Sequence, residues 1–344
     1  MGLCLSSVSS EVHSEHNEKE NTFHQNAVYC EAQSQTVIPN GAQSSIGSVY
    51  SRTGSKGLNQ DSGILYQGYG AEDGVLGGVF DGHGKNGHLV SSMVRNRLPS
   101  LILSQISTAI AEAKSSSRLQ HQEPHEIESG KIAQTSQAWG EACASAFRVM
   151  DKEVKLREDI DHSTSGTTAV VVIRQGEEIV IANLGDSRAV LGRVNEDGEL
   201  SAVQLTTDLK PSVPSEAERI RKCQGRVLAL KGEPHIQRVW LPHEDMPGLA
   251  MSRAFGDFLL KDHGIIAVPQ ISCHRISSED QFVILATDGV WDVMGNNEAV
   301  AAARSALEGG KSAAKAVVDA AVAAWKRRFP SSKVDDCTVV CISL

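Results

Sequence analysis

The sequence predicts an α+β fold, because short apolar segments bounded by Gly, Asn or Asp alternate with longer amphipathic ones. The short segments are typical of antiparallel strands and lie at 75–80, 168–173, 178–184, 188–191, 226–230 and 281–286. Apolar positions recur at helical spacing over 88–113, 137–155, 296–308 and 311–327. Strands and helices do not alternate at the regular spacing of βαβ units, so a mixed, largely antiparallel arrangement is favoured.

Helix breakers and side-chain alternation refine these elements. Pro99 predicts a kink or a break in the first helical segment, because proline removes a backbone donor and crowds the preceding turn. Gly309 and Gly310 separate the last two helices. Cys337 and Cys341 alternate along an apolar C-terminal segment, which predicts a strand with both thiols in the core.

Length and composition predict one large folded domain. The chain has 344 residues with 40% apolar content, which is enough for a sizeable core, and no internal linker divides it. We expect the domain to span 46–344 and residues 1–45 to form a disordered N-terminal tail. Residues 115–134 are rich in Ser, Gln, Glu and His without periodicity, which predicts a surface linker inside the domain.

Charge and cysteine usage restrict the class of protein. A formal charge of -9 argues against nucleic acid as a partner, because that affinity comes from clustered Lys and Arg. An odd number of cysteines, 7, with no Cys-x-x-Cys pair, no cleavable signal peptide and no long apolar stretch indicate a reduced intracellular protein. We therefore expect the protein to be cytoplasmic, and these features are equally compatible with an additional pool in the nucleus.

The N-terminus carries an acylation pattern. Gly2 follows Met1 and Ser6 occupies the sixth position, as N-myristoylation requires, while Cys4 is a candidate for palmitoylation. One myristoyl chain binds a bilayer only marginally, so Cys4 would have to supply the second anchor to the plasma membrane. The alternative is a chance match in an unstructured start of the chain.

Acidic residues recur where predicted strands end. Asp81-Gly82 and Asp288-Gly289 each follow an apolar segment, and Asp61, Asp186 and Asp335 lie at comparable strand ends. One Asp-Gly pair alone fits an ordinary hairpin turn. Several together favour a metal site, because carboxylate and carbonyl oxygens are the ligands that magnesium and manganese prefer.

These motifs, taken in order, resemble the metal-dependent type 2C protein serine/threonine phosphatases, including plant members with an acylatable N-terminus. The matching segments are 79–84, 165–169, 183–188, 249–257, 285–292 and 335–340. The resemblance implies two stacked antiparallel β-sheets with helices on both outer faces, and it favours a monomer. It also implies hydrolysis of phosphoserine and phosphothreonine in protein substrates by an activated water, with no covalent phosphoenzyme.

The resemblance assigns a ligand set for two Mg2+ or Mn2+ ions. Asp81 would bridge both ions, the Gly82 carbonyl would bind one of them, and Asp288 and Asp335 would bind the other. Asp61 would orient metal-bound water from the second shell. Asp186 and Asp292 would hold, with Asp288, a third and weaker ion. A salt bridge between Asp186 and Arg188 is the structural alternative.

His83 and Lys56 are the candidates for acting on the substrate. His83 follows the bridging Asp by two residues and is placed to protonate the leaving alkoxide, although a His satisfied by backbone is the usual alternative. Lys56 stands where many members of the family have Arg, so the phosphate would meet a point charge, with Arg52 as a possible replacement. Gln60 replaces a Glu. We expect Asp257 to organise its loop rather than to bind metal.

Three competing interpretations carry less weight. Residues 82–87 fit the G-x-G-x-x-G pattern of dinucleotide sites, but Asp81 would repel a pyrophosphate and no acid follows for the ribose. His121 and His125 suggest zinc, yet no further ligand lies nearby and a solvated loop is favoured. A pseudophosphatase would keep the fold without turnover, although the bridging ligands are all present.

Overall fold

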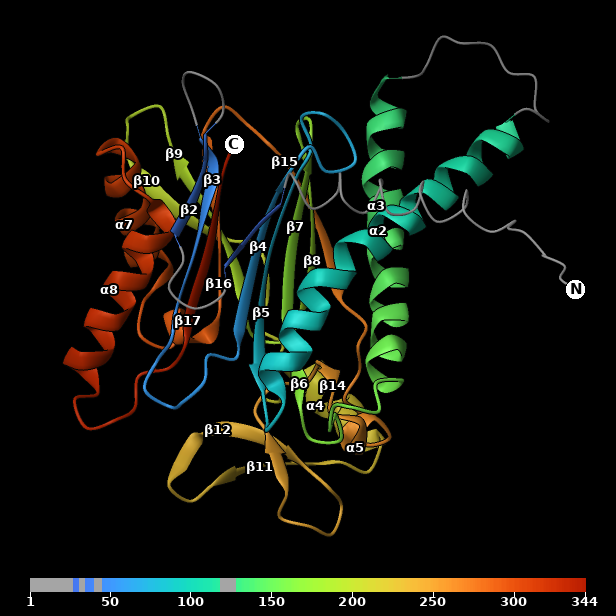
Figure 1. Cartoon of the computed structure of the whole chain (residues 1–344), viewed down its shortest axis with the longest axis vertical. Coiled ribbons are helices and arrows are strands. Elements are labelled where there is room, and N and C mark those ends of the chain that lie inside the picture. The colour runs from blue at the N-terminus through green and yellow to red at the C-terminus, as the bar shows by residue number, and fades with distance from the viewer. Residues whose placement is uncertain (1–26, 31–34, 40–44, 118–127) are drawn as a thin grey trace, which may run out of the picture.

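Two large antiparallel sheets lie face to face in the computed structural model, which describes residues 27–30, 35–39, 45–117 and 128–344 (Figure 1). The first sheet has the order β1 (Ala27–Cys30), β4 (Asp61–Gln67), β5 (Val75–His83), β7 (Ala169–Gln175), β8 (Glu178–Leu184) and β15 (Gln270–Arg275). Two short strands extend this sheet beside β5, namely β6 (Gly166–Thr167) and β14 (Phe255–Gly256). The second sheet has the order β10 (Leu200–Gln204), β9 (Arg188–Val194), β16 (Asp280–Ala286), β17 (Cys337–Ser343), β3 (Ser45–Arg52) and β2 (Gln35–Pro39).

Helices cover the outer faces of both sheets. The first sheet is covered by α2 (Gly87–Ser117) and α3 (Glu128–Lys155), and the second by α7 (Asn296–Glu308) and α8 (Ala313–Arg328). The expected sandwich of two stacked sheets between helical layers is therefore confirmed. None of the described helices has both the length and the hydropathy needed to cross a membrane.

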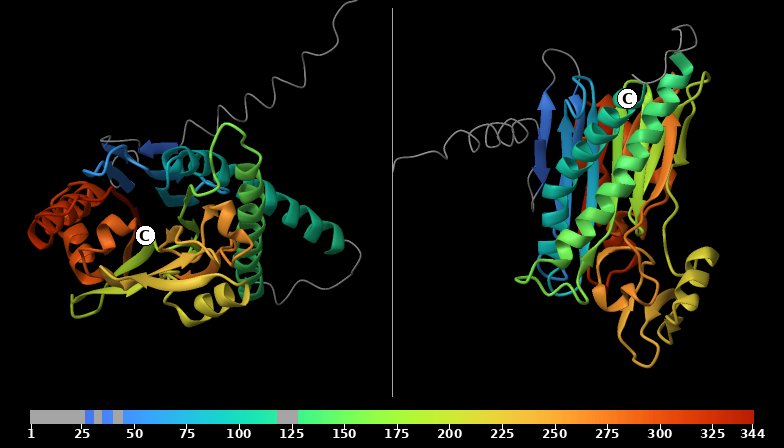
Figure 2. Two further views of the ribbon diagram at one scale, coloured as in Figure 1. Left: turned by 90° about the horizontal axis from the view of Figure 1, so that it is seen from below. Right: turned by 90° about the vertical axis from the view of Figure 1, so that its right-hand side faces the viewer.

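A smaller unit lies at one end of the sandwich. It contains the three-stranded sheet β11 (Arg226–Leu230), β12 (Glu233–Trp240) and β13 (Pro247–Leu249), with the helices α4 (Pro214–Lys222) and α5 (Phe258–Lys261) nearby. The right panel of Figure 2 shows this unit below the lower ends of the large sheets. Its own apolar cluster is built around Ile220, Val239 and Leu260.

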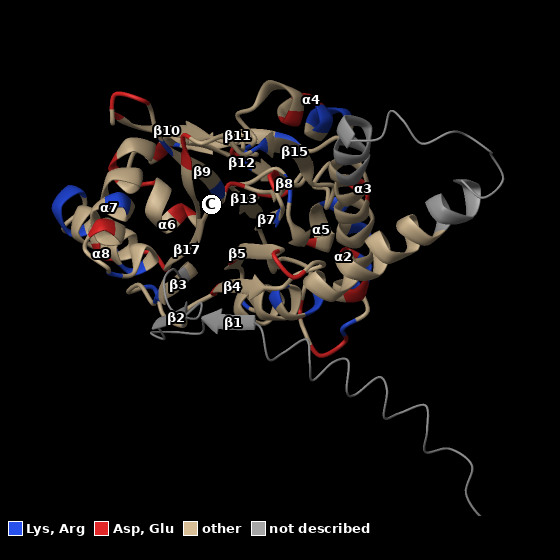
Figure 3. Cartoon of the chain, turned by 90° about the horizontal axis from the view of Figure 1, so that it is seen from above, with Lys and Arg blue, Asp and Glu red and all other residues tan. Residues whose placement is uncertain are grey.

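Three apolar layers hold the sandwich together. Buried Val and Ile side chains from both sheets, such as Val79 and Val340, fill the space between the sheets. Phe147 of α3 belongs to the layer under the first pair of helices, and Val317 of α8 belongs to the layer under the second pair. Each fully buried side chain of this size contributes roughly 1.5–3 kcal/mol of hydrophobic stabilisation. In Figure 3, which looks along the strands, both signs of charge are interspersed over helices and loops, whereas the strands are mostly uncharged.

The predicted elements are present, with bounds that differ slightly. The six predicted strand segments lie in β5, β7, β8, β9, β11 and β16, and the four helical segments lie in α2, α3, α7 and α8. The separation at Gly309 and Gly310 is confirmed, since Gly310 has a φ of 64° that ends α7 cleanly. Pro99 lies inside a continuous α2, so the predicted break is wrong. The Pro99 carbonyl instead accepts a 2.7 Å hydrogen bond from the Tyr69 hydroxyl.

Two predicted irregular segments are shorter than expected. Within the predicted tail 1–45, β1 pairs with β4 and β2 pairs with β3, because both large sheets leave an edge strand open there. Within the predicted linker 115–134, α2 continues to Ser117 and α3 begins at Glu128. Polar sequence does not prevent a helix from extending, so periodicity alone underestimated both helices. Gly2, Cys4, His121 and His125 lie outside the described residues.

Candidate active site

Acidic residues stand at four strand ends, and their carboxylates are close enough to repel one another. Asp61 begins β4 and Asp81 lies in β5, where the two residues are direct partners in the antiparallel register. Asp288 follows β16 and begins the short helix α6 (Asp288–Trp291), while Asp335 precedes β17. We call this group the carboxylate cluster, and its members are Asp61, Asp81, Asp186, Asp288, Asp292, Asp335 and Asp336.

Asp61 is buried, and hydrogen bonds hold both its side chain and its backbone amide in place. Its Oδ2 accepts a 2.8 Å bond from the Thr287 hydroxyl, and its amide donates a 3.0 Å bond to the Asn59 side chain. Burial, followed by repulsion from Asp336, raises the pKa of Asp61 to about 7. Thr287 precedes Asp288 on the other sheet, so this bond connects the two sheets inside the cluster.

Asp81 and Gly82 lie near the end of β5, just before the turn that leads into α2. The Asp81 amide donates to the Thr168 hydroxyl at 3.1 Å, and the Asp81 carbonyl accepts from the Thr168 amide at 2.9 Å. A Cβ at position 82 would lie only 2.4 Å from the Gly87 oxygen, so only glycine fits here. Burial, then repulsion from Asp288, raises the pKa of Asp81 well above its usual range.

The second Asp-Gly turn has the same steric requirement. A Cβ on Gly289 would lie 1.9 Å from the Asp336 oxygen, so glycine lets α6 approach the chain that leads into β17. Burial raises the pKa of Asp288 well above its usual range, and repulsion from Asp186 and Asp292 adds to the effect. Both Asp-Gly turns therefore place a repelled carboxylate where two segments come into close contact.

Lys56 lies against the carboxylate cluster. Its ammonium forms an ion pair with Asp335, and its side chain remains 55% exposed. Burial opposes its charged form, but Asp335 outweighs burial and raises the pKa of Lys56. The suggested replacement by Arg52 is not supported, because Arg52 pairs with Asp319 of α8 at 3.3 Å.

Asp336 is a member of the cluster whose role the sequence alone did not indicate. Its two carboxylate oxygens accept 2.8 Å hydrogen bonds from the amides of Gly54 and Gln60. Asp336 thereby ties the loop that carries Lys56 to the start of β17. The doubled acid at 335–336, placed just before a strand, is the signal that could have indicated a second role.

Asp186 does not pair with Arg188, so that structural alternative is wrong. Arg188 instead makes a bidentate ion pair with Asp208 at 2.9 and 2.7 Å and lies over the ring of Trp291. Asp186 Oδ2 lies 3.7 Å from the Lys210 ammonium, and its buried Oδ1 has no hydrogen-bond partner in the described part of the chain. Burial raises the pKa of Asp186, although Lys210 partly compensates.

His83 pairs with Asp257, an acid for which only a loop-organising role was expected. Nε2 of His83 lies 2.7 Å from Oδ2 of Asp257, whose side chain is 1% exposed. Burial disfavours the charged imidazole, but Asp257 outweighs burial and raises the pKa of His83. The alternative of a histidine satisfied by backbone is not what the structure shows.

The donor set fits hard divalent cations. Among the described residues, no three His, Cys, Asp or Glu side chains converge as a ready-made chelate. The cluster nevertheless offers only oxygen ligands, and mutual repulsion contributes to the raised pKa values of Asp61, Asp81 and Asp288. Cations placed among them would relieve that repulsion, which is the chemistry that magnesium or manganese supplies.

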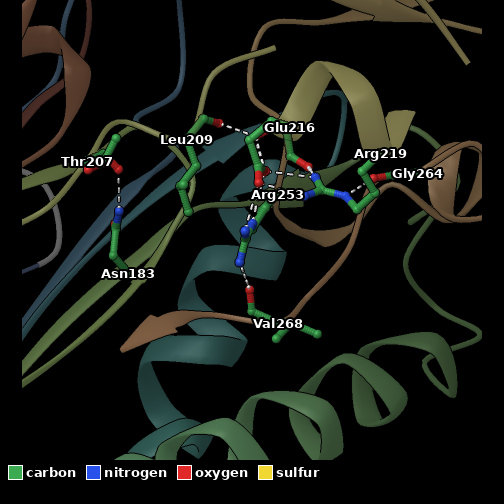
Figure 4. A network of polar contacts seen from close by, with 9 residues as sticks. Asn183, Thr207, Leu209, Glu216, Arg219, Arg253, Gly264 and Val268 are labelled. Carbon is green, nitrogen blue, oxygen red and sulfur yellow. Dashed lines mark hydrogen bonds and ion pairs between the residues drawn. The ribbon is translucent and has the colours of Figure 1, made fainter. Parts of the chain in front are cut away.

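A second buried acid, Glu216 of α4, has the opposite surroundings (Figure 4). Arg219 donates to both of its oxygens at 2.6 and 2.8 Å, and Arg253 does the same at 2.7 and 2.9 Å. The Ser252 hydroxyl donates at 2.6 Å. Burial would raise the pKa of Glu216, but the donors from Arg253 and Arg219 lower it to about 2. Ser252 and Arg253, from the segment 249–257, are therefore structural residues.

Comparison with known proteins gives one consistent result. A family model described as "Protein phosphatase 2C" matches residues 58–327. The chain is 53% identical to "Probable protein phosphatase 2C 72" of Arabidopsis thaliana, over 100% of this chain and 98% of that protein. It is also 53% identical to "Probable protein phosphatase 2C 61" of Arabidopsis thaliana, over 87% of this chain and 84% of that protein.

A solved structure shows the same fold. The crystal structure of serine-threonine phosphatase 2C from Toxoplasma gondii superposes with a TM-score of 0.74 at 25% sequence identity. The match covers 90% of this chain and 98% of that chain. The sandwich and its lower end are therefore shared over nearly the whole described structure.

Proposed function

The chain belongs to the protein phosphatase 2C family of metal-dependent protein serine/threonine phosphatases, and we propose that the carboxylate cluster is its catalytic centre. The observation that carries this proposal is that two sheets bring Asp61, Asp81, Asp288 and Asp335 close enough for their carboxylates to repel one another. The substrates are phosphoserine and phosphothreonine in proteins.

Each residue of the cluster has a role in this proposal. Asp81 and the Gly82 carbonyl would hold one divalent cation, and Asp81 with Asp288 and Asp335 would hold another. Bound there, Mg2+ or Mn2+ ions supply positive charge for the phosphoryl oxygens and lower the pKa of a water nucleophile. Asp61 would orient that water through one carboxylate oxygen, while its other oxygen accepts the hydrogen bond from Thr287.

The remaining residues act on the phosphate and the leaving group. Lys56 forms an ion pair with Asp335, and its side chain is exposed enough to contact a substrate phosphate as well. His83 gives a proton to the serine or threonine oxygen as the phosphorus-oxygen bond breaks. Asp186 and Asp292 are candidates for a third and weaker ion, with Lys210 as an internal competitor for that position.

Phosphate release from a phosphothreonine peptide tests this proposal. The purified full chain is assayed with Mn2+, with Mg2+ and with excess EDTA. We expect release with either metal and none in EDTA. A folded protein that releases no phosphate with either metal would overturn the proposal and favour a pseudophosphatase, with Lys56 and Gln60 as the first positions to restore to Arg and Glu.

We propose separately that acylation of Gly2 and Cys4 holds the protein at the cytosolic face of the plasma membrane. The support is the sequence pattern alone, with two acyl groups needed for stable anchoring. Gly2→Ala is expected to move the protein from the membrane fraction to the soluble fraction. If this variant stays at the membrane, the anchor lies elsewhere in the chain.

A further inference from the structure

We propose that Asp257 is the positioning residue for His83, and that it holds Nε2 of the ring so that Nδ1 becomes the nitrogen that protonates the leaving oxygen. This inference rests on the proposed function, because His83 needs a leaving group to protonate. It adds a residue, Asp257, and an assignment of the two ring nitrogens.

The contact itself has the geometry of an orienting pair. Nε2 of His83 and Oδ2 of Asp257 are 2.7 Å apart, within the range of a charge-assisted hydrogen bond. The His83 side chain is 18% exposed and the Asp257 side chain is 1% exposed, so solvent competes little for this bond. A carboxylate that accepts from one imidazole nitrogen fixes both the ring orientation and the role of the other nitrogen.

The other nitrogen has no partner among the described residues. Nδ1 of His83 is buried and makes no hydrogen bond with any residue that the structure describes. A buried polar atom without a partner costs free energy, and such atoms recur where a ligand supplies the missing contact. Since His83 follows Gly82 directly, the leaving oxygen of a substrate bound at the cluster is the natural acceptor.

The strand register places the two residues together although they are 174 positions apart. His83 is opposite Gly166 in the pairing of β5 with β6, and Gly166 is opposite Gly256 in the pairing of β6 with β14. Asp257 follows Gly256, and its amide donates a 3.1 Å bond to the Ser165 carbonyl. The contact is therefore built into the edge of the first sheet.

A second ion pair fixes the segment that carries Asp257. Asp151 of α3 accepts a 3.0 Å bond from the Gly256 amide and a 3.1 Å bond from the Lys261 ammonium. Lys261 also donates to the Ala254 carbonyl at 2.7 Å. Asp257 itself has a φ of 51°, a conformation that costs a non-glycine residue free energy unless neighbouring contacts enforce it.

The chemical step balances with the residues named. The water oxygen forms a new bond to phosphorus, while the bond between phosphorus and the serine or threonine oxygen breaks and leaves its electron pair on that oxygen. The oxygen takes the proton from Nδ1, which gives the free hydroxyl. One proton of the attacking water stays on the phosphate, and the other restores His83 through solvent.

The test compares two substrates that differ in their leaving group. Asp257→Asn is assayed with Mn2+ on a phosphothreonine peptide and on p-nitrophenyl phosphate, whose leaving group needs little protonation. We expect kcat on the peptide to fall by roughly 10- to 100-fold, which is part of the roughly 100- to 10,000-fold that general acid catalysis supplies, and kcat on the aryl phosphate by less than about 3-fold. His83→Ala should give the same pattern, and the double variant should lose no more than His83→Ala alone.

A matched control exists in the same molecule. His274 Nε2 and Asp280 Oδ2 form a similar pair, 2.8 Å apart with Asp280 fully buried, on β15 and β16. Asp280→Asn should change both substrates by the same factor. If Asp257→Asn does not fold, Asp257→Glu keeps the charge but moves the carboxylate, and it should show a smaller loss confined to the peptide.

Two results would overturn the inference. Equal losses on both substrates would make Asp257 a structural residue, and a double variant with the product of both single losses would separate Asp257 from His83. A wild-type protein without metal-dependent release from either substrate would overturn the proposed function and this inference together, whereas wild-type release with unselective losses would overturn the inference alone.

Discussion

The carboxylate cluster and Glu216 are both acidic sites that lie partly or wholly below the surface, but their electrostatic surroundings are opposite. Asp61, Asp81 and Asp288 have raised pKa values, because burial and neighbouring carboxylates oppose their charge. Glu216 is buried like Asp61, with 2% of its side chain exposed, yet its pKa is lowered to about 2. The difference is that Arg219 and Arg253 bring their charge to Glu216 from within the chain.

This contrast separates a structural acid from the acids that we propose bind cations. A buried carboxylate with two bidentate guanidinium partners is complete, and it fixes α4 to the segment that carries Arg253. Lys56 and Lys210 are the nearby cations of the carboxylate cluster, and they offset only part of its charge. The cluster is therefore suited to cations supplied from outside, whereas Glu216 is not.

The largest effect is expected for Asp81→Asn. The cluster would lose the ligand shared by both ions, so metal-dependent turnover should fall by at least roughly 100-fold, which corresponds to about 2.7 kcal/mol of transition-state stabilisation. Phosphate release from a phosphothreonine peptide measures the loss. Turnover above roughly a tenth of wild type would remove Asp81 from the bridging role.

Glu216→Gln should give the largest loss of stability. The change leaves two buried guanidinium groups without their carboxylate, which should lower the free energy of unfolding by about 3–5 kcal/mol. Urea denaturation in EDTA measures it. Glu308→Gln is the control, because its ion pair with Arg304 is on the surface and should contribute less than about 1 kcal/mol. A loss no greater than this control would contradict the structural role of Glu216.

Added metal should stabilise the protein only through the cluster. Mn2+ at about 100 times its dissociation constant is expected to raise the free energy of unfolding by about 2.7 kcal/mol. Thermal melting with and without Mn2+ measures this, and Asp288→Asn should abolish most of the rise. In EDTA the same variant should be at least as stable as wild type, since it removes a repelled charge. A clear loss of stability in EDTA would argue against repulsion at Asp288.

The pH dependence should have opposite signs at the two sites. The pKa of Asp61 is about 7 in the folded protein and 3.8 ordinarily, so the folded state holds this proton more tightly than the unfolded state. Its contribution to stability therefore falls as the pH rises between these two pKa values. The pKa of Glu216 is about 2 in the folded protein and 4.5 ordinarily, so its contribution to stability is lost as the pH falls through that range. Asp61 shares its protons with the neighbouring carboxylates, so we expect the free energy of unfolding to fall by only about 1–2 kcal/mol on account of Asp61. Denaturation of wild type and Asp61→Asn in EDTA at pH 5 and pH 7.5 measures it, and a wild-type loss no larger than that of the variant would contradict the sign.

The sequence indicated the strand ends of the site but not every partner. Asp61, Asp81, Asp186, Asp288 and Asp335 could be predicted because each follows or precedes a recognisable apolar strand segment. The pair of His83 with Asp257 could not, because it depends on the two-residue strands β6 and β14, which carry no periodicity. The sequence did not indicate Glu216 either. Its partner Arg219 lies in α4 and its partner Arg253 lies in a loop, and no local pattern shows that the loop folds back onto the helix.

The fold shows the same division. Segments with strong periodicity, such as β8 and α7, were predicted within one or two residues. The edge strands β1 and β2 were predicted as disordered tail, because their pairing with existing sheets is a tertiary effect that a local pattern does not contain.

The most direct test of the contrast is a Mn2+ titration of EDTA-stripped protein, with melting temperature and phosphate release measured in the same samples. We predict that both rise together for wild type, that Asp81→Asn loses both responses, and that Glu308→Gln keeps both. Full phosphate release before any Mn2+ is added, or a melting temperature that rises equally in Asp81→Asn, would contradict a catalytic cluster that depends on external cations.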